Sequence, residues 1–121
     1  MSGLVERAEE VARKAYAPYS NYLVGAVVRT RDGQEFIGTN VENAAYPLTQ
    51  CAEKTAIGAA ASAGYRPGDL EVVAISASPC GGCRQWLAEW RVGRVEYRRA
   101  DGSVASASPF ELLPDSWELP G

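Results

Sequence analysis

Three cysteines are the residues of this sequence best suited to chemistry. Cys80 and Cys83 lie three positions apart beside a proline, Cys51 lies upstream, and the chain contains no histidine. Structural zinc sites are closed by four protein ligands, whereas catalytic zinc sites use three and leave the fourth position to water. Iron–sulfur clusters of the usual kind need four thiolates. Three soft ligands therefore favour an open, hydrolytic zinc site.

Glu53, two residues after Cys51, is the candidate proton carrier. If Cys51 begins a helix, the free backbone amides and the helix dipole favour its thiolate. Glu53 could then reach a water molecule activated by the metal without binding the metal itself. Taken alone, Glu53 is more often an exposed helical carboxylate and Cys51 a core residue. The short offset between the two residues favours the catalytic interpretation.

The pair Cys80 and Cys83 also has an alternative interpretation. The sequence Cys-Gly-Gly-Cys has the spacing of a thioredoxin-like redox pair. The third thiol at Cys51 and the tract at residues 40–47 argue against a redox pair, and we retain the metal site as the leading hypothesis.

The composition indicates a globular protein with a small-molecule partner. The 121 residues, of which 46% are hydrophobic and 22% charged, suit a single domain over residues 1–121. No apolar run approaches the ~20 residues of a membrane span, and the amino terminus lacks the apolar core of a signal peptide. We therefore expect a cytoplasmic protein with no membrane partner. The net charge of −3 with scattered basic residues argues against a nucleic-acid partner.

Hydrophobic periodicity and turn residues predict alternating helices and strands. We expect helices at residues 4–15, 51–63 and 79–93, a helical turn at 109–113, and strands at 22–29, 34–39, 71–76, 94–99 and 103–108. Asp-Gly turns join the first two and the last two strands, and such short turns connect only antiparallel strands. Residues 40–50 are expected to form a loop. This order predicts a mixed sheet covered by helices.

Five segments of the chain resemble the small, homotetrameric, zinc-dependent cytidine deaminases. They are residues 15–26, 38–47, 51–56, 78–85 and 111–114, in the order of that family. Zinc deaminases use a Pro-Cys-x-x-Cys signature and a glutamate that is not a ligand. The resemblance implies an α/β fold of three α-β-α layers, with a five-stranded mixed sheet whose last two strands are antiparallel. It also implies a homotetramer that deaminates cytidine and deoxycytidine in pyrimidine salvage.

The resemblance further implies a role for individual residues. Cys51, Cys80 and Cys83 would bind Zn²⁺, and Glu53 would transfer protons. The implied substrate contacts are Tyr22 against the base, Asn40 and Glu42 at the ribose hydroxyls, and the backbone of Ala52 and Ser78 at the pyrimidine edge. Without the resemblance, Asn40 and Glu42 equally suit turn chemistry.

Two further groups of residues follow from the resemblance. Ala44, Tyr46 and Trp117 would contact neighbouring subunits. Lys54 stands where the family commonly has an arginine that hydrogen-bonds the thiolates, and lysine supplies only a point charge. Arg84 or Gln85 could then share that role.

Two other functions remain open from the sequence. Residues 75–79 are several positions shorter than is usual in the family, which suggests a modified pyrimidine nucleoside or a cytosine-bearing antibiotic as substrate. From a different class, the chain could be a zinc-stabilised interaction module without turnover.

Overall fold

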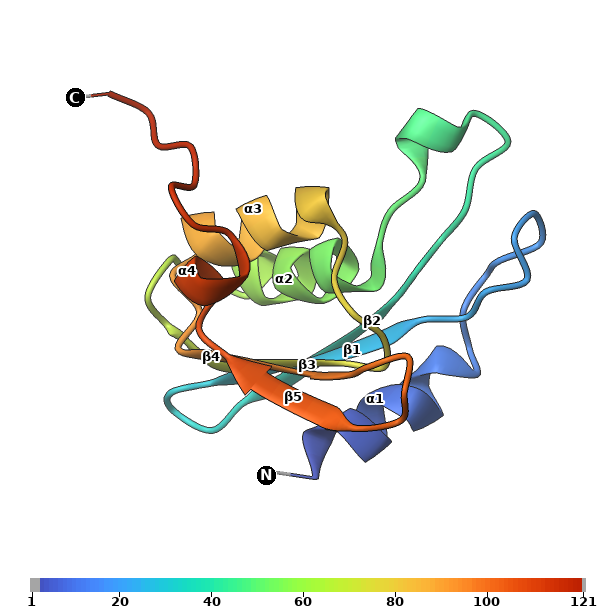
Figure 1. The fold of residues 1–121 in the computed structure, drawn as a ribbon, viewed down its shortest axis with the longest axis horizontal. Coiled ribbons are helices and arrows are strands. Elements are labelled where there is room, and N and C mark those ends of the chain that lie inside the picture. Colours follow the sequence, from blue (N-terminus) through green and yellow to red (C-terminus); the bar gives the residue numbers. More distant parts are fainter. Residues whose placement is uncertain (1–2, 121) are drawn as a thin grey trace.

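The computed structural model describes residues 3–120, which form one sheet flanked by helices (Figure 1). The elements in chain order are α1 (Leu4–Ala12), β1 (Gly25–Thr30), β2 (Glu35–Thr39), the 3-10 turn η1 (Tyr46–Leu48), α2 (Ala52–Ser62), β3 (Leu70–Ile75), α3 (Gly81–Glu89), β4 (Arg94–Arg98), β5 (Val104–Ala107) and α4 (Pro109–Leu112). The predicted order of helices and strands is confirmed.

The sheet has the strand order β2-β1-β3-β4-β5. β1 is antiparallel to β2 and β3, β3 is parallel to β4, and β4 is antiparallel to β5. The parallel pair is joined through α3, because parallel neighbours need a long crossover. The predicted mixed, five-stranded sheet with its last two strands antiparallel is confirmed.

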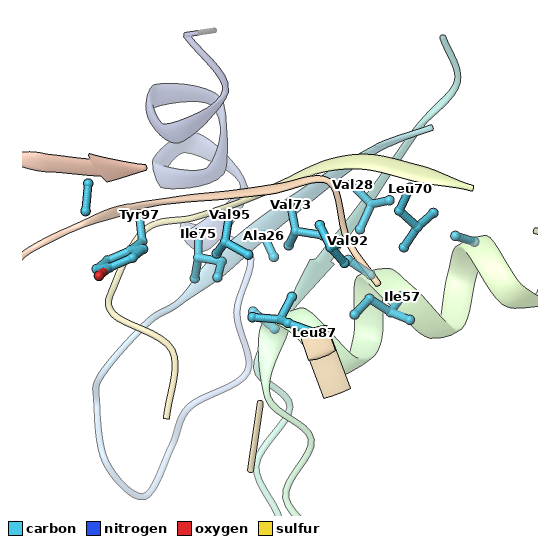
Figure 2. Packing of buried hydrophobic residues seen from close by; sticks show 14 residues of the cluster. Ala26, Val28, Ile57, Leu70, Val73, Ile75, Leu87, Val92, Val95 and Tyr97 are labelled. Atoms are coloured by element: carbon cyan, nitrogen blue, oxygen red, sulfur yellow. The ribbon is translucent and has the colours of Figure 1, made fainter. Parts of the chain in front are cut away.

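The helices form the two outer layers. α1 lies on one face of the sheet, and α2 and α3 lie on the other (Figure 1). In β1, Val27 packs in the cluster beneath α1, whereas Ala26 and Val28 pack in the cluster beneath α2 and α3. Figure 2 shows Ile57 of α2 and Leu87 of α3 facing the strands from that second cluster. The alternation of apolar side chains along each strand thus builds two cores.

α2 lies unusually close to β2 because both elements use small residues at their contact. A Cβ atom added at Gly38 would stand 2.4 Å from the Ala56 amide nitrogen and 2.7 Å from the Ala52 carbonyl oxygen. Only glycine leaves room for that approach. The start of α2 is therefore fixed against the sheet.

Two boundaries differ from the predicted ones. α1 ends at Ala12 rather than at residue 15, because Tyr16 instead pairs with the segment after β2 through Tyr16 N to Asn40 O (3.2 Å) and Glu42 N to Tyr16 O (2.9 Å). β1 begins at Gly25 rather than at residue 22, since the Asn40 side chain bonds the backbone just before it. Tertiary contacts override local propensity at both places.

Smaller differences concern the loop and α3. The loop at residues 40–50 contains η1 and a bridge between Val41 and Gln50. α3 begins at Gly81, two residues later than predicted, and ends at Glu89, four residues earlier than predicted. Within residues 3–120, no helix has both the length and the apolar character needed to cross a bilayer.

Candidate active site

The three thiols meet where α2 and α3 begin. Cys51 and Cys80 are the N-cap residues of α2 and α3, and Cys83 lies in the first turn of α3. Their sulfur atoms all lie within 4.8 Å of one another. Around a tetrahedral zinc with Zn–S bonds of about 2.3 Å, sulfur atoms lie ~3.8 Å apart. The cluster therefore fits one tetrahedral ion after a small inward movement, with a fourth position left to a non-protein ligand.

The surroundings of the thiols affect their ionisation differently. Burial raises the pKa of Cys51 and of Cys83. At Cys80, burial acts in the same direction, but hydrogen bonds from the backbone and side chain of Cys83, the backbone of Gly82 and the side chain of Cys51 together outweigh it, so the pKa of Cys80 is lowered. Helix N-termini stabilise thiolates in this way. Cys80 is thus the most easily ionised of the three thiols, and a bound cation would favour the thiolate of the other two.

Glu53 is buried beside this cluster. It lies in the first turn of α2, and only 3% of the residue is exposed. Burial raises the pKa of the Glu53 carboxyl, although the hydrogen bond with Cys83 and the charge of Lys54 act in the opposite direction. A carboxyl group with a raised pKa can both release and accept a proton near neutral pH. Its position suits proton transfer next to a bound metal.

One pocket of about 280 Å³ contains the metal ligands and every predicted substrate contact. Of the residues named from the sequence, Tyr22, Asn40, Glu42, Cys51, Ala52, Glu53, Ser78, Cys80 and Cys83 line it. Ser20, Val24, Thr49 and Ala77 also line it and were not named from the sequence. Each of these four is within two residues of a predicted site residue, and this proximity was the signal available for finding them.

Asn40 hydrogen-bonds the backbone of the segment that leads into β1 and borders the pocket. Its Oδ1 accepts a hydrogen bond from Val24 N (2.9 Å), and its Nδ2 donates one to Tyr22 O (2.8 Å). The residue is 9% exposed. Each end of the side-chain amide can make a second bond, so Asn40 can serve both the backbone and a ligand.

Glu42 forms hydrogen bonds with the same segment before β1. Its Oε1 accepts hydrogen bonds from Tyr19 N (2.9 Å) and Ser20 N (3.0 Å), and the Ser20 hydroxyl donates to its Oε2. The hydrogen bond from the Ser20 hydroxyl is the main reason that the pKa of Glu42 is lowered. Glu42 is therefore a charged acceptor at the edge of the pocket.

The predicted subunit contacts lie outside the pocket lining. Tyr46 and Trp117 are 68% and 64% exposed. The Tyr46 ring packs edge-on against Tyr19, with 6.2 Å between ring centroids. Ala44 is also exposed, in the loop before η1. These three side chains are free to meet another chain.

Lys54, Arg84 and Gln85, which were expected near the thiolates, make different interactions. Lys54 affects the site through its charge, which acts to lower the pKa of Cys51 and Glu53. Arg84 donates to Pro79 O, Ser78 Oγ and Leu112 O. Gln85 donates from Nε2 to the carbonyl oxygen of Trp117 (3.0 Å) and so ties the C-terminal segment to α3.

Comparisons by family, by sequence and by structure all find similarity to cytidine deaminases. Residues 2–98 match the family described as the cytidine and deoxycytidylate deaminase zinc-binding region. The cytidine deaminase of Halalkalibacterium halodurans is 38% identical over 94% of this chain and 91% of its own length. The crystal structure of cytidine deaminase from Burkholderia pseudomallei superimposes with a TM-score of 0.88 at 44% identity, over 95% of this chain and 97% of that chain. For cytidine deaminase from Mycobacterium tuberculosis, the TM-score is 0.80 at 35% identity, over 96% and 95% of the two chains.

Proposed function

The chain belongs to the cytidine and deoxycytidylate deaminase family, and from this membership we propose that it deaminates cytidine and deoxycytidine to uridine and deoxyuridine in pyrimidine salvage. One observation supports the reaction most directly. Cys51, Cys80 and Cys83 converge within 4.8 Å, and the buried Glu53 lies beside them in the same pocket. The arrangement combines an open metal site with a proton carrier.

The chain's own residues divide the chemistry among them. Cys51, Cys80 and Cys83 would hold Zn²⁺, which when bound would make water nucleophilic near neutral pH. Glu53 accepts a proton from the attacking water and delivers it to ring N3. It then takes the second proton from the new hydroxyl group on C4 and delivers it to the leaving amino group. The water oxygen bonds to C4, the C4–N4 bond breaks, and ammonia leaves. The raised pKa of Glu53 supports both directions of proton transfer.

The pocket favours a nucleoside over a nucleotide. We assign Tyr22 to the base, Asn40 and Glu42 to the ribose hydroxyls, and the backbone of Ala52 and Ser78 to the pyrimidine edge. Glu42 is negatively charged at the pocket edge, and none of the described lining residues is lysine or arginine. A 5′-phosphate would therefore meet no lining cation and would be repelled by a carboxylate.

Exposed apolar residues beside the pocket support assembly into a homotetramer. They lie on residues 16–23 and 41–48, the two segments that flank the site, and are Tyr16, Tyr19, Tyr22, Leu23, Val41, Tyr46 and Leu48. Such a concentration of apolar surface is typical of an interaction site. In this assembly Ala44, Tyr46 and Trp117 contact the neighbouring subunits.

The chain is proposed to act as a single cytoplasmic domain. Both cores share one sheet, which supports one domain over residues 1–121. The three cysteines are unpaired, as is usual for a reducing compartment.

Zinc content and ammonia release measured together test the proposed function. The purified protein should bind one zinc per chain and release ammonia from cytidine and deoxycytidine, with much lower turnover of cytidine 5′-phosphate. Stoichiometric zinc without ammonia from any of the three compounds would contradict the proposal and favour a non-catalytic module. Sedimentation of the same sample should give the mass of four chains.

A further inference from the structure

The first turn of α3 carries two metal ligands but has little local stability of its own. Its first two residues are Gly81 and Gly82, and glycine costs about 1 kcal/mol relative to alanine in a helix interior. A Cβ atom added at either glycine would have no atom within 4 Å, so neither position is packed. Another group must hold this turn in place.

The side chain of Arg84 supplies that group. Its Nε donates to Pro79 O at 2.9 Å, its Nη2 to Ser78 Oγ at 3.2 Å, and its Nη1 to Leu112 O at 3.0 Å. Two of these acceptors lie in the irregular segment just before Cys80. The third is the carbonyl of the last residue of α4, which has no partner within its own helix. One guanidinium thus joins the segment before α3 to α4.

The charge of Arg84 does not stabilise α3 at this position. A cation in the first turn of a helix opposes the positive end of the helix dipole. Three hydrogen bonds, two of them partly buried, offset that opposition, since hydrogen bonds from charged donors are stronger than neutral ones. A lysine could not replace these bonds, because an ammonium lacks the planar fork that reaches three separated acceptors.

We propose that Arg84 is a positioning residue for the metal site. By fixing Ser78 and Pro79 against α4, its guanidinium holds Cys80 at the position where its sulfur meets those of Cys51 and Cys83. The same bonds fix the Ser78 backbone at the pocket, and this second consequence rests on the proposed function. The first consequence requires only that the cysteines bind zinc.

The test compares Arg84→Lys and Arg84→Gln with Arg91→Lys, a control two residues after the end of α3. Each zinc-loaded protein is mixed with an excess of a colorimetric chelator, and the rate of zinc release is recorded. Loss of a group that orients a metal ligand lowers metal affinity by about 10–100-fold. We expect Arg84→Lys and Arg84→Gln to release zinc faster by a factor in this range, and Arg91→Lys to release it at the wild-type rate.

A purely structural role would give a different result. Arg84→Lys would then lower the urea midpoint of the zinc-stripped protein while zinc release stayed within twofold of wild type, and the proposal would be overturned. If neither Arg84 variant folds, Ser78→Ala removes one acceptor and should still accelerate release several-fold; an unchanged rate there would equally overturn it. Faster zinc release in a chain that never releases ammonia would keep this role for Arg84 and reject the deaminase function.

Discussion

Glu53 and Cys83 line the same pocket, although the two residues belong to different helices. Glu53 lies in the first turn of α2 and Cys83 in the first turn of α3. Both helices pack on the same face of the sheet. The distance between the proposed proton carrier, Glu53, and the proposed metal ligand, Cys83, is therefore set by the packing of two helices on one sheet.

Glu53→Gln should retain zinc but lose nearly all turnover. The amide has almost the same shape as the carboxyl group, so the thiol cluster should be undisturbed, but it cannot carry a proton between water and substrate. General acid–base catalysis contributes about 10²–10⁴-fold, and ammonia release should fall at least by this factor. Glu10→Gln, on the exposed side of α1, should keep wild-type turnover. Full activity in Glu53→Gln would remove Glu53 from the mechanism.

Cys51→Ala should release zinc and lower stability. A ligand that binds only the folded state stabilises it by about 4 kcal/mol at a free concentration of 1,000 Kd. Wild type should therefore lose several degrees of its melting temperature when EDTA is added, whereas Cys51→Ala should start at the lower temperature and show no further change. Elemental analysis measures the zinc. Stoichiometric zinc in Cys51→Ala would show that the three sulfurs do not share one ion.

Asn40→Ala should weaken both the fold and substrate binding. The substitution leaves Val24 N and Tyr22 O without their partner, and a buried polar group left unsatisfied costs about 1–3 kcal/mol. Because Tyr22 lies in the segment that Asn40 holds, KM should rise as well. Urea unfolding and steady-state kinetics measure the two effects. Asn43→Ala, in an exposed turn, serves as the comparison and should change stability less. Equal losses in both variants would argue against a special role for Asn40.

The sequence was sufficient for most of the fold. The Asp-Gly turns and the apolar run of β3 predict the strands, and the short turn before β5 requires the antiparallel end of the sheet. The end of α1 and the start of β1 were misplaced because Tyr16 and Asn40 form contacts with segments distant in the chain. Such contacts leave no periodic signal in either segment.

Gly38→Ala should separate α2 from β2. The new Cβ would stand 2.4 Å from Ala56 N, and overpacking of this kind typically costs about 1–3 kcal/mol. Because α2 carries Glu53 in its first turn, ammonia release should fall with stability. Gly58→Ala is the matched control within α2: its Cβ would meet no atom within 4 Å, and alanine should stabilise the helix by up to about 1 kcal/mol. If both variants shifted the urea midpoint of unfolding in the same direction, this account of the contact between α2 and β2 would be refuted.

The candidate site was only partly predictable. The number and spacing of the cysteines indicate the metal, and the offset of Glu53 from Cys51 indicates the proton carrier. The hydrogen bonds of Arg84 depend on where α4 ends, and those of Glu42 depend on the approach of Ser20. These relationships join residues more than twenty positions apart, and only the folded chain reveals them.

The unpacked glycines at the start of α3 offer an opportunity for enzyme engineering. Gly81 and Gly82 border the sulfur ligands, have open space where a Cβ would stand, and do not require a left-handed backbone. A combinatorial library at these two positions could therefore introduce side chains without displacing existing atoms. Variants selected from it for metal retention after heating would yield a more durable biocatalyst, because residues that form helices better than glycine would stabilise the turn that carries Cys83.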